Sequence, residues 1–232
     1  MTVDVIIPTY KPDQRFFELI ALLDKQTYPI SHIRIINTEE KYFEKIIYGR
    51  RYEEEYHNLC VTHISKREFD HAATRSRAVT HSDADIFVMM TMDAYPKDEH
   101  LIENLVRALM PEKVAVSYAR QLANQDAGMI EQFTRNYNYP DTSCVKTAAD
   151  IEKLGIKTFF CSDVCAAYKR EIFDRLGGYP DHAIFNEDMI YAHKAVMAGY
   201  SIAYAADACV YHSHNYTGAQ QFHRNFDMGV SQ

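Results

Sequence analysis

The sequence lacks the features of several large protein classes. Its five cysteines contain no Cys-x-x-Cys pair, and they are odd in number and scattered, which favours neither a disulfide framework nor a zinc ribbon. No segment approaches the ~20 consecutive apolar residues that span a bilayer, and the start, "MTVDVIIPTY", has no basic, apolar leader pattern. The sequence therefore predicts a soluble protein of the reducing cytoplasm.

The sequence also has fewer basic residues than acidic ones, 25 against 32. The formal net charge of −7 disfavours a nucleic-acid or anionic-membrane binder, because either would need a basic surface to neutralise phosphates. No Gly/Ser-rich linker, internal repeat or low-complexity tract divides the chain. With 232 residues, 47% of them hydrophobic, we expect one domain with one core.

Four strand-and-helix units follow one another in the first half. Each pairs a short apolar run with an amphipathic stretch: "VDVIIP" precedes Phe16 to Leu23, "HIRIIN" precedes "KYFEKIIYG", "CVTHIS" precedes "HAATRSRAV", and "DIFVMM" precedes "HLIENLVRALM". Such a series is typical of an α/β fold with a mostly parallel, Rossmann-like sheet flanked by helices. Ligands of this fold class bind beyond the carboxyl ends of the strands.

The second half is less regular. A polar, turn-forming stretch, "NYNYPDTSCVKTAAD", interrupts the pattern before "FFCSDVCAAYKREIFDRLGGYP" resumes with a strand and a helix. We predict a nucleotide-binding half at residues 1–112 and an acceptor-binding half at 113–232, sharing one sheet. The end, "TGAQQFHRNFDMGVSQ", predicts a helix that stops without a cap, so the natural chain is expected to extend past residue 232, with room there for peripheral membrane or subunit contacts.

Because ligands bind beyond the carboxyl ends of the strands, the position of each acidic residue relative to its strand decides whether it can contact a ligand. The literal Asp-x-Asp of Asp83 and Asp85 precedes the apolar run "IFVMM" and is expected at its amino end, away from a ligand. Asp93 follows the same run and is expected at the ligand edge, with Thr91 beside it. Taken alone, Asp93 is equally well explained as a cap for the helix that begins near Lys97.

Other polar residues are predicted to converge on the same edge, where hydroxyl, carboxylate, imidazole and guanidinium groups suit a nucleoside diphosphate and a divalent cation. A strand ends at "YHSHNY", and histidines two residues apart project to one face if the strand continues. Adjacent acids in "FNEDMIYAHKAVMAG" begin a helix, where they also gain from its dipole. The candidates are Thr9, Tyr10, Thr38, Glu39, Arg67 to His71, Glu187, Asp188, His212 and His214.

In this ordered series the sequence resembles the inverting glycosyltransferases of family 2, which have the A-type glycosyltransferase fold. The resemblance covers nearly the whole chain: "VIIPTY", "HAATR", "MTMDA", "LGGYPDHAIFNEDMIYAHKAVMAGYSIAYAADACVYH" and "SHNYT". The stretches "TMDAYP", "FCSDVCAAYKREIFDRLGGYP" and "YHSHNYT" look most like the branch that includes bacterial rhamnosyltransferases of surface polysaccharide synthesis.

The resemblance implies roles for individual residues. Asp188 matches the catalytic base, with Glu187 beside it orienting the acceptor or a loop. Asp93 matches the metal-binding acid, and His212, or else His214, matches the downstream ligand of Mg²⁺ or Mn²⁺. The nucleotide-sugar side is matched by Pro8, Thr9, Tyr10, Glu39, Arg67, His71, Arg75, Thr91 and Asp93.

Two departures weaken the match. The branch usually has Asn-His-Gly-Gly-Thr-Arg-Asn where this chain has Asp70-His71-Ala72-Ala73-Thr74-Arg75-Ser76, so neither the loop geometry nor the donor sugar follows from the resemblance. Asp163 stands in "CSDVC" where Asn is more usual, which adds a negative charge near the expected acceptor side.

The expected reaction is an inverting transfer of a sugar, first of all rhamnose from dTDP-rhamnose and next a hexose from a UDP-sugar. The acceptor is expected to be a hydroxyl of a growing, lipid-linked surface glycan at the inner face of the cell membrane. A non-catalytic nucleotide- or glycan-binding scaffold domain is one alternative. A sugar nucleotidyltransferase is a weaker one, because "KPDQRFF" after the first strand has no glycine-rich loop. The oligomeric state is left open.

Overall fold

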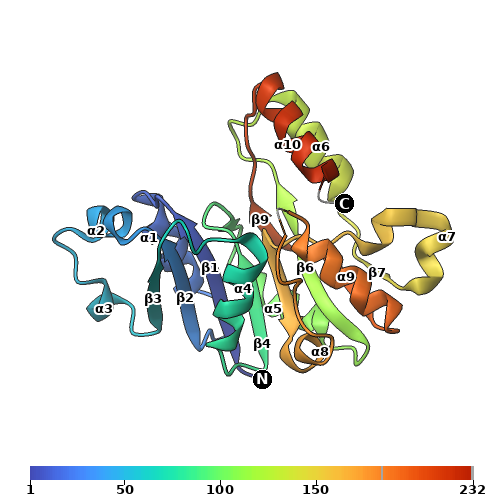
Figure 1. Ribbon diagram of the computed structural model, residues 1–232, viewed down its shortest axis with the longest axis horizontal. Coiled ribbons are helices and arrows are strands. Elements are labelled where there is room, and N and C mark those ends of the chain that lie inside the picture. Colours follow the sequence, from blue (N-terminus) through green and yellow to red (C-terminus); the bar gives the residue numbers. More distant parts are fainter. Residues whose placement is uncertain (184, 231–232) are drawn as a thin grey trace.

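The computed structural model describes residues 1–183 and 185–230. Within them, nine strands form one sheet in the order β3-β2-β1-β4-β8-β6-β9-β5, with β7 paired to β9. The sheet is flanked by helices (Figure 1). The single-domain α/β fold predicted from the sequence is thereby confirmed, and one sheet continues across both predicted halves.

The strands are β1 (Val3–Tyr10), β2 (His32–Thr38), β3 (Leu59–Ile64), β4 (Ile86–Met90), β5 (Tyr95–Pro96), β6 (Val114–Leu122), β7 (Cys144–Lys146), β8 (Cys165–Lys169) and β9 (Ser201–Tyr211). The helices are α1 (Arg15–Asp24), α2 (Glu40–Ile47), α3 (Tyr52–Glu55), α4 (His71–Thr80), α5 (Leu101–Leu109), α6 (Met129–Asn138), α7 (Ile151–Leu154), α8 (Arg170–Arg175), α9 (Glu187–Met197) and α10 (Gly218–Val230). Two short 3-10 helices, η1 (Ala148–Asp150) and η2 (Gly155–Phe159), precede and follow α7.

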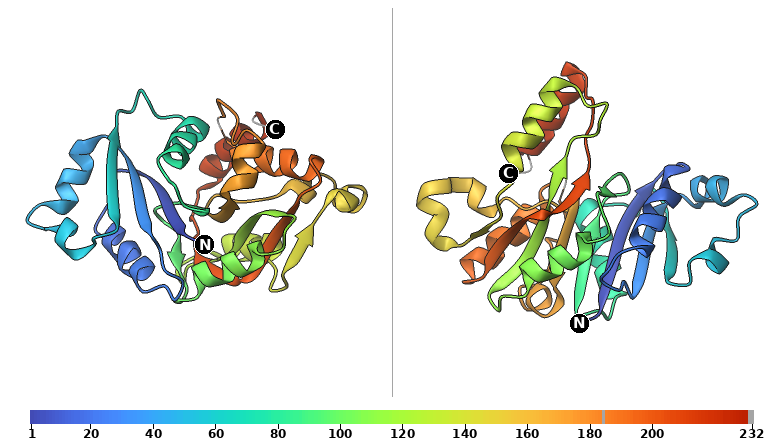
Figure 2. Two further views of the ribbon diagram at one scale, coloured as in Figure 1. Left: turned by 90° about the horizontal axis from the view of Figure 1, so that it is seen from below. Right: turned by 180° about the vertical axis from the view of Figure 1, so that it is seen from behind.

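Both faces of the sheet are buried. Side chains alternate along each strand, so Val5 and Ile7 of β1 join one core cluster and Ile6 joins the other. Helices α1, α2 and α5 cover the first face, and α4, α8 and α9 cover the second. The left view of Figure 2 shows these two layers on opposite sides of the sheet. Because both faces are covered, the strands read as continuous apolar runs in the sequence.

Strand direction decides which residues share an edge. The pairings make β1, β2, β3, β4, β6 and β9 run in one direction and β5, β7 and β8 in the other. The carboxyl ends of the six codirectional strands therefore lie along one edge. The amino end of β8 lies at that edge too, which brings the segment before Cys165 to the same place.

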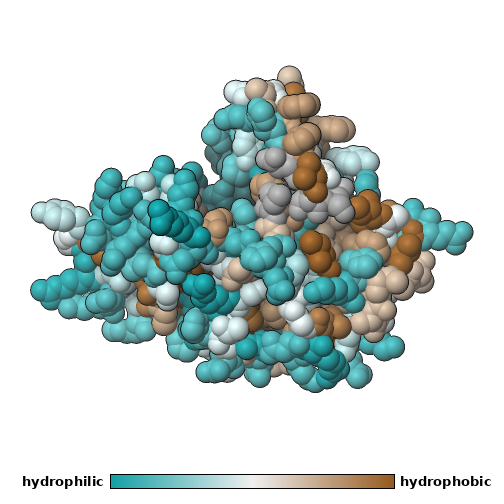
Figure 3. All heavy atoms as spheres, in the orientation of Figure 1, coloured by the Kyte–Doolittle hydropathy of each residue, from teal (hydrophilic) through white to brown (hydrophobic). Residues whose placement is uncertain are grey.

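Helices α6 and α10 pack side by side and project from this edge (Figures 1 and 2). The space-filling view shows both apolar and polar atoms over this projection (Figure 3). Exposed apolar side chains on the two helices include Phe133 of α6 and Phe222 and Phe226 of α10. The predicted C-terminal helix is confirmed up to Val230. Among the described helices, none combines the length and the apolar character needed to cross a bilayer.

Candidate functional site

Asp93 and the literal Asp-x-Asp lie at opposite ends of β4, as the sequence predicted. Asp93 follows the carboxyl end of the strand, and Asp85 directly precedes its amino end. The Asp85 carboxylate accepts a hydrogen bond from the backbone N–H of Thr2 at 2.8 Å, so it ties down the N-terminus. Asp83 is exposed at the same end. Of these three acids, only Asp93 is at the edge where ligands of this fold bind.

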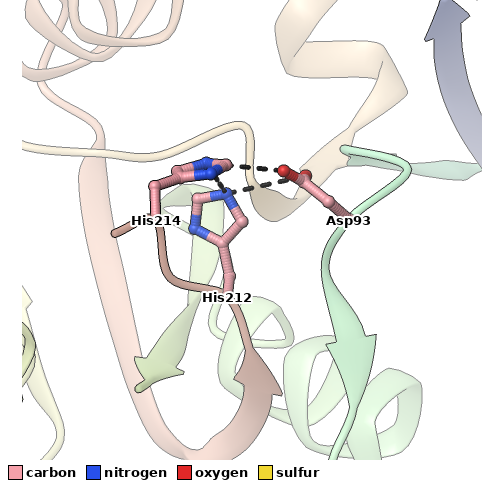
Figure 4. A group of neighbouring side chains, drawn as sticks. All are labelled: Asp93, His212 and His214. Carbon is pink, nitrogen blue, oxygen red and sulfur yellow. Dashed lines mark hydrogen bonds and ion pairs between the residues drawn. The ribbon is translucent and has the colours of Figure 1, made fainter. Parts of the chain in front are cut away.

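Asp93 faces two histidines from the end of β9 (Figure 4). The Nε2 atom of His212 lies 3.6 Å from Oδ1 of Asp93, and the Nε2 atom of His214 lies 3.4 Å from Oδ2. The two Nε2 atoms are 3.1 Å apart. His212 is buried, whereas His214 and Asp93 are partly exposed. Residues more than a hundred positions apart in the chain thus form one cluster, here called the metal triad.

The metal triad fits a divalent cation. Its three ligand atoms lie within 4.8 Å of one another. Two metal–ligand bonds of about 2.1 Å at a right angle would separate their ligand atoms by about 3 Å, close to the separations observed. Imidazole nitrogen suits first-row transition metals and carboxylate oxygen suits Mg²⁺ and Mn²⁺, so the mixed set is chemically suited to such an ion.

The surroundings of Asp93 and His214 favour the protonation states in which these two residues bind metal. Burial alone would raise the pKa of Asp93, but hydrogen bonding to His212 and its charge, aided by Thr91 and His214, hold that pKa well below its usual range. Burial lowers the pKa of His214, and the neighbouring His212 lowers it further. Metal binds an ionised carboxylate and a neutral imidazole, so a metal ion would displace any proton through which Nε2 of His212 bonds to Asp93.

A second cluster forms around Asp188 in the first turn of α9. Its carboxylate accepts hydrogen bonds from the backbone N–H of Met189 at 2.7 Å and of Asp163 at 2.9 Å. Asn186, the residue before the helix, has φ +65°, a conformation that Asn tolerates better than most residues. Asp163 reaches Asp188 because it precedes the antiparallel strand β8. These contacts hold the Asp188 carboxylate in one orientation.

Arg75 is surrounded by the acids of this cluster. Its Nη1 lies 3.1 Å from Oε1 of Glu187, and its Nε lies 3.5 Å from Oδ2 of Asp163. All three residues are buried. The hydroxyl of Tyr168 donates a hydrogen bond to Oδ1 of Asp163. The resemblance matched Arg75 to the nucleotide-sugar side, but in the structure its guanidinium is engaged by protein carboxylates.

Three carboxylates around one guanidinium leave an excess of negative charge. Burial, followed by the charge of Asp188, raises the pKa of Asp163 to about 8. Burial, followed by the charge of Glu187, raises the pKa of Asp188 to about 6, while its two backbone N–H bonds oppose that rise. Both acids are therefore harder to ionise than an ordinary aspartate. Asp188 has the lower pKa of the two, and its two backbone N–H bonds favour the ionised form that a general base needs.

The predicted nucleoside residues lie at the ends of β1 and β2. Thr9 is buried and its hydroxyl donates to the side-chain oxygen of Asn37 at 3.2 Å. Tyr10, the last residue of β1, is exposed and packs edge-on against Tyr42 with ring centroids 5.6 Å apart. Pro8 precedes them in the strand and is partly buried. An exposed aromatic ring at this edge is available to stack on a nucleobase.

Glu39 joins two loops rather than standing free. Its φ of +67° places it outside ordinary strand and helix backbone, and its carboxylate accepts the backbone N–H of Lys66 at 2.8 Å. The other carboxylate oxygen lies 2.8 Å from Nζ of Lys41. Arg67, next to Lys66, is exposed. Glu39 thereby fixes the loop that carries Arg67.

His71 begins α4 inside a pocket of about 390 Å³. Burial, followed by the charge of Arg75, lowers the pKa of His71. Asp70 caps α4 by accepting the backbone N–H of Ala73 at 2.8 Å. Asp and Asn cap helices equally well, so the departure at position 70 preserves the helix start. The pocket is lined by Phe69, Asp70, His71, His182, Ala183 and Phe185.

The sequence reasoning missed a set of residues behind the metal triad. Gln121, at the end of β6, accepts a hydrogen bond from Arg135 and lies 3.0 Å from Nδ1 of His212. On α10, the Arg224 guanidinium lies 5.7 Å from the ring centre of Tyr216, which stacks on His214. Strand-end position was a usable signal for Gln121. No spacing pattern in the sequence links it to Arg135 or His212.

Comparison with known proteins agrees with this geometry. A family model described as Glycosyl transferase family 2 matches residues 4–177. The O-antigen chain rhamnosyltransferase RfbN of Salmonella typhimurium is 39% identical over 231 residues, which are 99% of this chain and 72% of that protein. The O-antigen chain rhamnosyltransferase WbaN of Salmonella anatum is 38% identical over 228 residues, 97% of this chain and 70% of that protein.

Solved structures share the fold at lower identity. The mannosyltransferase PcManGT from Pyrobaculum calidifontis, in complex with GDP-Man and Mn²⁺, superposes with a TM-score of 0.70 at 20% identity. S. aureus TarS in complex with UDP-GlcNAc superposes with a TM-score of 0.69 at 15% identity. The alignments cover 95% of this chain in both cases, but 59% and 61% of the other chains. The fold is therefore the A-type glycosyltransferase fold.

Proposed function

The chain belongs to glycosyl transferase family 2, and we propose that it is a metal-dependent, inverting rhamnosyltransferase of bacterial surface polysaccharide synthesis. The observation that carries this proposal is the presence of two clusters at one sheet edge. The metal triad offers ligands for a divalent cation, and the second cluster offers one ionised, oriented carboxylate. Those are the two requirements for departure of a nucleoside diphosphate and attack by a hydroxyl.

Asp188 is the proposed general base. The acceptor hydroxyl loses its proton as its oxygen attacks the anomeric carbon, and an ionised carboxylate accepts that proton. Glu187 holds Arg75 and does not reach the substrate itself in this scheme. Arg75 in turn links α9 to α4, so these two residues position the base and the loop before α4.

Asp93, His212 and His214 are the proposed metal ligands. The ion supplies neutralisation of the charge that develops on the diphosphate as it leaves. We propose Mn²⁺ in preference to Mg²⁺, because Mg²⁺ takes oxygen ligands almost exclusively and two of the three ligands here are imidazole nitrogens. The solved mannosyltransferase with GDP-Man was determined with Mn²⁺, which supports the same choice.

The nucleotide is proposed to bind along the ends of β1 to β4. Tyr10 stacks on the base beside Pro8 and Thr9, and Glu39 holds the adjacent loop with Arg67. Thr91 and His71 border the sugar. In this proposed arrangement residues 1–112 bind the donor, and residues 113–232 bind the acceptor and supply His212 and His214 to the metal triad.

The donor proposed first is dTDP-rhamnose, because the two similar Salmonella proteins are named rhamnosyltransferases. The acceptor is proposed to be a lipid-linked glycan at the cytoplasmic face of the membrane, because both relatives are named for the O-antigen chain. A nucleic-acid partner is not part of the proposal, since the net charge of −7 disfavours one.

A thermal-shift panel tests the donor. The protein is melted with dTDP-rhamnose, UDP-glucose, UDP-GlcNAc and GDP-mannose, each with and without Mn²⁺. A donor at 100 times its dissociation constant stabilises the folded protein by about 2.7 kcal/mol. We expect the largest shift with dTDP-rhamnose and Mn²⁺ together. If no nucleotide sugar raises the melting temperature under either condition, the proposed function is wrong.

A further inference from the structure

Gln121 is a buried polar residue with all of its hydrogen-bonding groups occupied. Its side-chain oxygen accepts from Nη1 of Arg135 and lies 3.0 Å from Nδ1 of His212. Its side-chain nitrogen donates to Oγ of Ser162 at 2.9 Å and to the hydroxyl oxygen of Tyr139 at 2.6 Å. The amide thus contacts four side chains, and each of these contacts constrains which way it faces.

Arg135 decides the orientation of this amide. A guanidinium can only donate, so the group of Gln121 that faces Arg135 must be its oxygen. Ser162 and Tyr139 carry hydroxyls, which accept or donate and therefore permit either orientation. The same oxygen faces His212, which leaves Nδ1 of His212 as the donor. A neutral imidazole with hydrogen on Nδ1 has its lone pair on Nε2, the atom that faces Asp93 and His214.

Helix α6 supports both histidines. Nε of Arg135 lies 2.7 Å from Oε1 of Glu131, one turn earlier on the helix, and both side chains are largely buried. Oε1 of Glu131 also accepts the backbone N–H of His214 at 3.3 Å. One ion pair on α6 therefore supports both histidines. Arg135 holds the amide that orients the ring of His212, and Glu131 holds the backbone of His214.

We propose that Gln121 is a positioning residue that fixes the Nδ1–H tautomer of His212 for metal binding, and that Arg135 fixes Gln121. The proposal rests on the metal site of the proposed function. The hydrogen bonds of Gln121 also connect the two clusters. Gln121 donates to Ser162, and the next residue, Asp163, donates its backbone N–H to Asp188. Partners of the second imidazole nitrogen set the affinity of metal sites by about 10- to 100-fold.

The tautomer is measured directly by nuclear magnetic resonance on protein with ¹⁵N-labelled histidines. Two-bond ¹H–¹⁵N correlations distinguish Nδ1–H from Nε2–H rings, and a His212→Gln variant assigns the signal. Without metal, we expect His212 of the wild type to be the Nδ1–H form. Gln121→Glu keeps an acceptor toward His212 and should keep this tautomer. Gln121→Met fills the space without an acceptor and should lose it.

Manganese affinity is measured on the same proteins by isothermal titration calorimetry. We expect Gln121→Met to bind Mn²⁺ about 10- to 100-fold more weakly than the wild type, and Gln121→Glu to bind within a few-fold of it. Arg135→Met, at a less buried position, allows the amide to rotate and should weaken binding in the same direction. It serves in place of Gln121→Met if that variant fails to fold, as judged by circular dichroism.

Two results would overturn the proposal. One is an Nε2–H ring at His212 in the wild type. The other is equal Mn²⁺ affinity in Gln121→Met, Arg135→Met and wild type, which would make the network irrelevant to the site. Failure of the wild type to bind Mn²⁺ at all would instead refute the metal site of the proposed function, and the tautomer measurement would still stand by itself.

Discussion

The backbone N–H of Asp163 donates a hydrogen bond to Oδ2 of Asp188 at 2.9 Å. This contact joins the segment before β8 to the first turn of α9, and it places a second acid beside the proposed base. The backbone N–H of Asp163 stabilises the ionised form of Asp188, and burial with the charge of Asp188 raises the pKa of the Asp163 side chain. Each acid therefore affects the ionisation of the other, and the consequence for each can be tested.

The pH dependence of transfer should report the base. Because the pKa of Asp188 is raised to about 6, the fraction of ionised base increases as the pH rises through that value. We expect kcat/KM for sugar transfer to rise through the same range and then to level off. A rate profile at saturating Mn²⁺ measures this. A profile that falls as the pH rises through 6 would require a group that acts in its protonated form.

Stability should depend on pH through Asp163. Its pKa is raised from 3.8 in the unfolded chain to about 8 in the folded protein. The folded state binds this proton more tightly, so the stabilisation is fully present below pH 3.8 and is lost as the pH rises toward 8. Asp163→Asn removes the titrating group. From urea titrations, we expect the free energy of unfolding of this variant to decrease less between pH 3.8 and 8 than that of the wild type. The same decrease with pH in both proteins would contradict the assignment.

Arg75 should prove structural. Arg75→Met leaves Glu187 and Asp163 buried without their cation, and breaking a buried pair in this way costs about 3–5 kcal/mol. We expect a loss of that size in the free energy of unfolding, measured without any nucleotide. Arg67→Met, at an exposed position beside the proposed nucleotide site, is the matched control and should leave unfolding unchanged. If Arg75→Met instead unfolds like the wild type and only weakens donor binding, Arg75 contacts the ligand.

The two aspartates that flank β4 should differ in metal binding. Asp93→Asn removes an anionic ligand from the metal triad, and loss of Mn²⁺ binding should show in electron paramagnetic resonance titrations of free Mn²⁺. Asp85→Asn changes the charge by the same amount at the other end of the strand and should bind Mn²⁺ as the wild type does. The reverse pattern would place the site at the literal Asp-x-Asp.

The fold and the metal triad were accessible from the sequence for a physical reason. Short apolar runs mark the longer strands, and the carboxyl ends of parallel strands meet at one edge, so Asp93 and His212 could be predicted to meet. The same rule removed Asp83 and Asp85 from consideration. The sequence left His212 and His214 as alternatives, whereas the structure turns the Nε2 atoms of both toward Asp93.

Other features depend on packing that no spacing encodes. Whether Arg75 faces a ligand or protein acids is decided by the docking of α9 against α4. The path from Arg135 through Gln121 to His212 joins a helix and two strands. The unusual Asp163 was noticed as an added charge, but its raised pKa follows from burial beside Asp188, which only the tertiary structure shows.

In the proposed mechanism, Asp188 acts as the base on a donor held with the metal triad. This role is tested by the release of dTDP from dTDP-rhamnose with Mn²⁺, measured for the wild type and for Asp188→Asn together with donor affinity. Water takes the place of the acceptor in this assay. We predict that Asp188→Asn binds the donor normally and turns it over about 10²- to 10⁴-fold more slowly, the usual contribution of general base catalysis. Equal turnover by the two proteins would rule out Asp188 as the base.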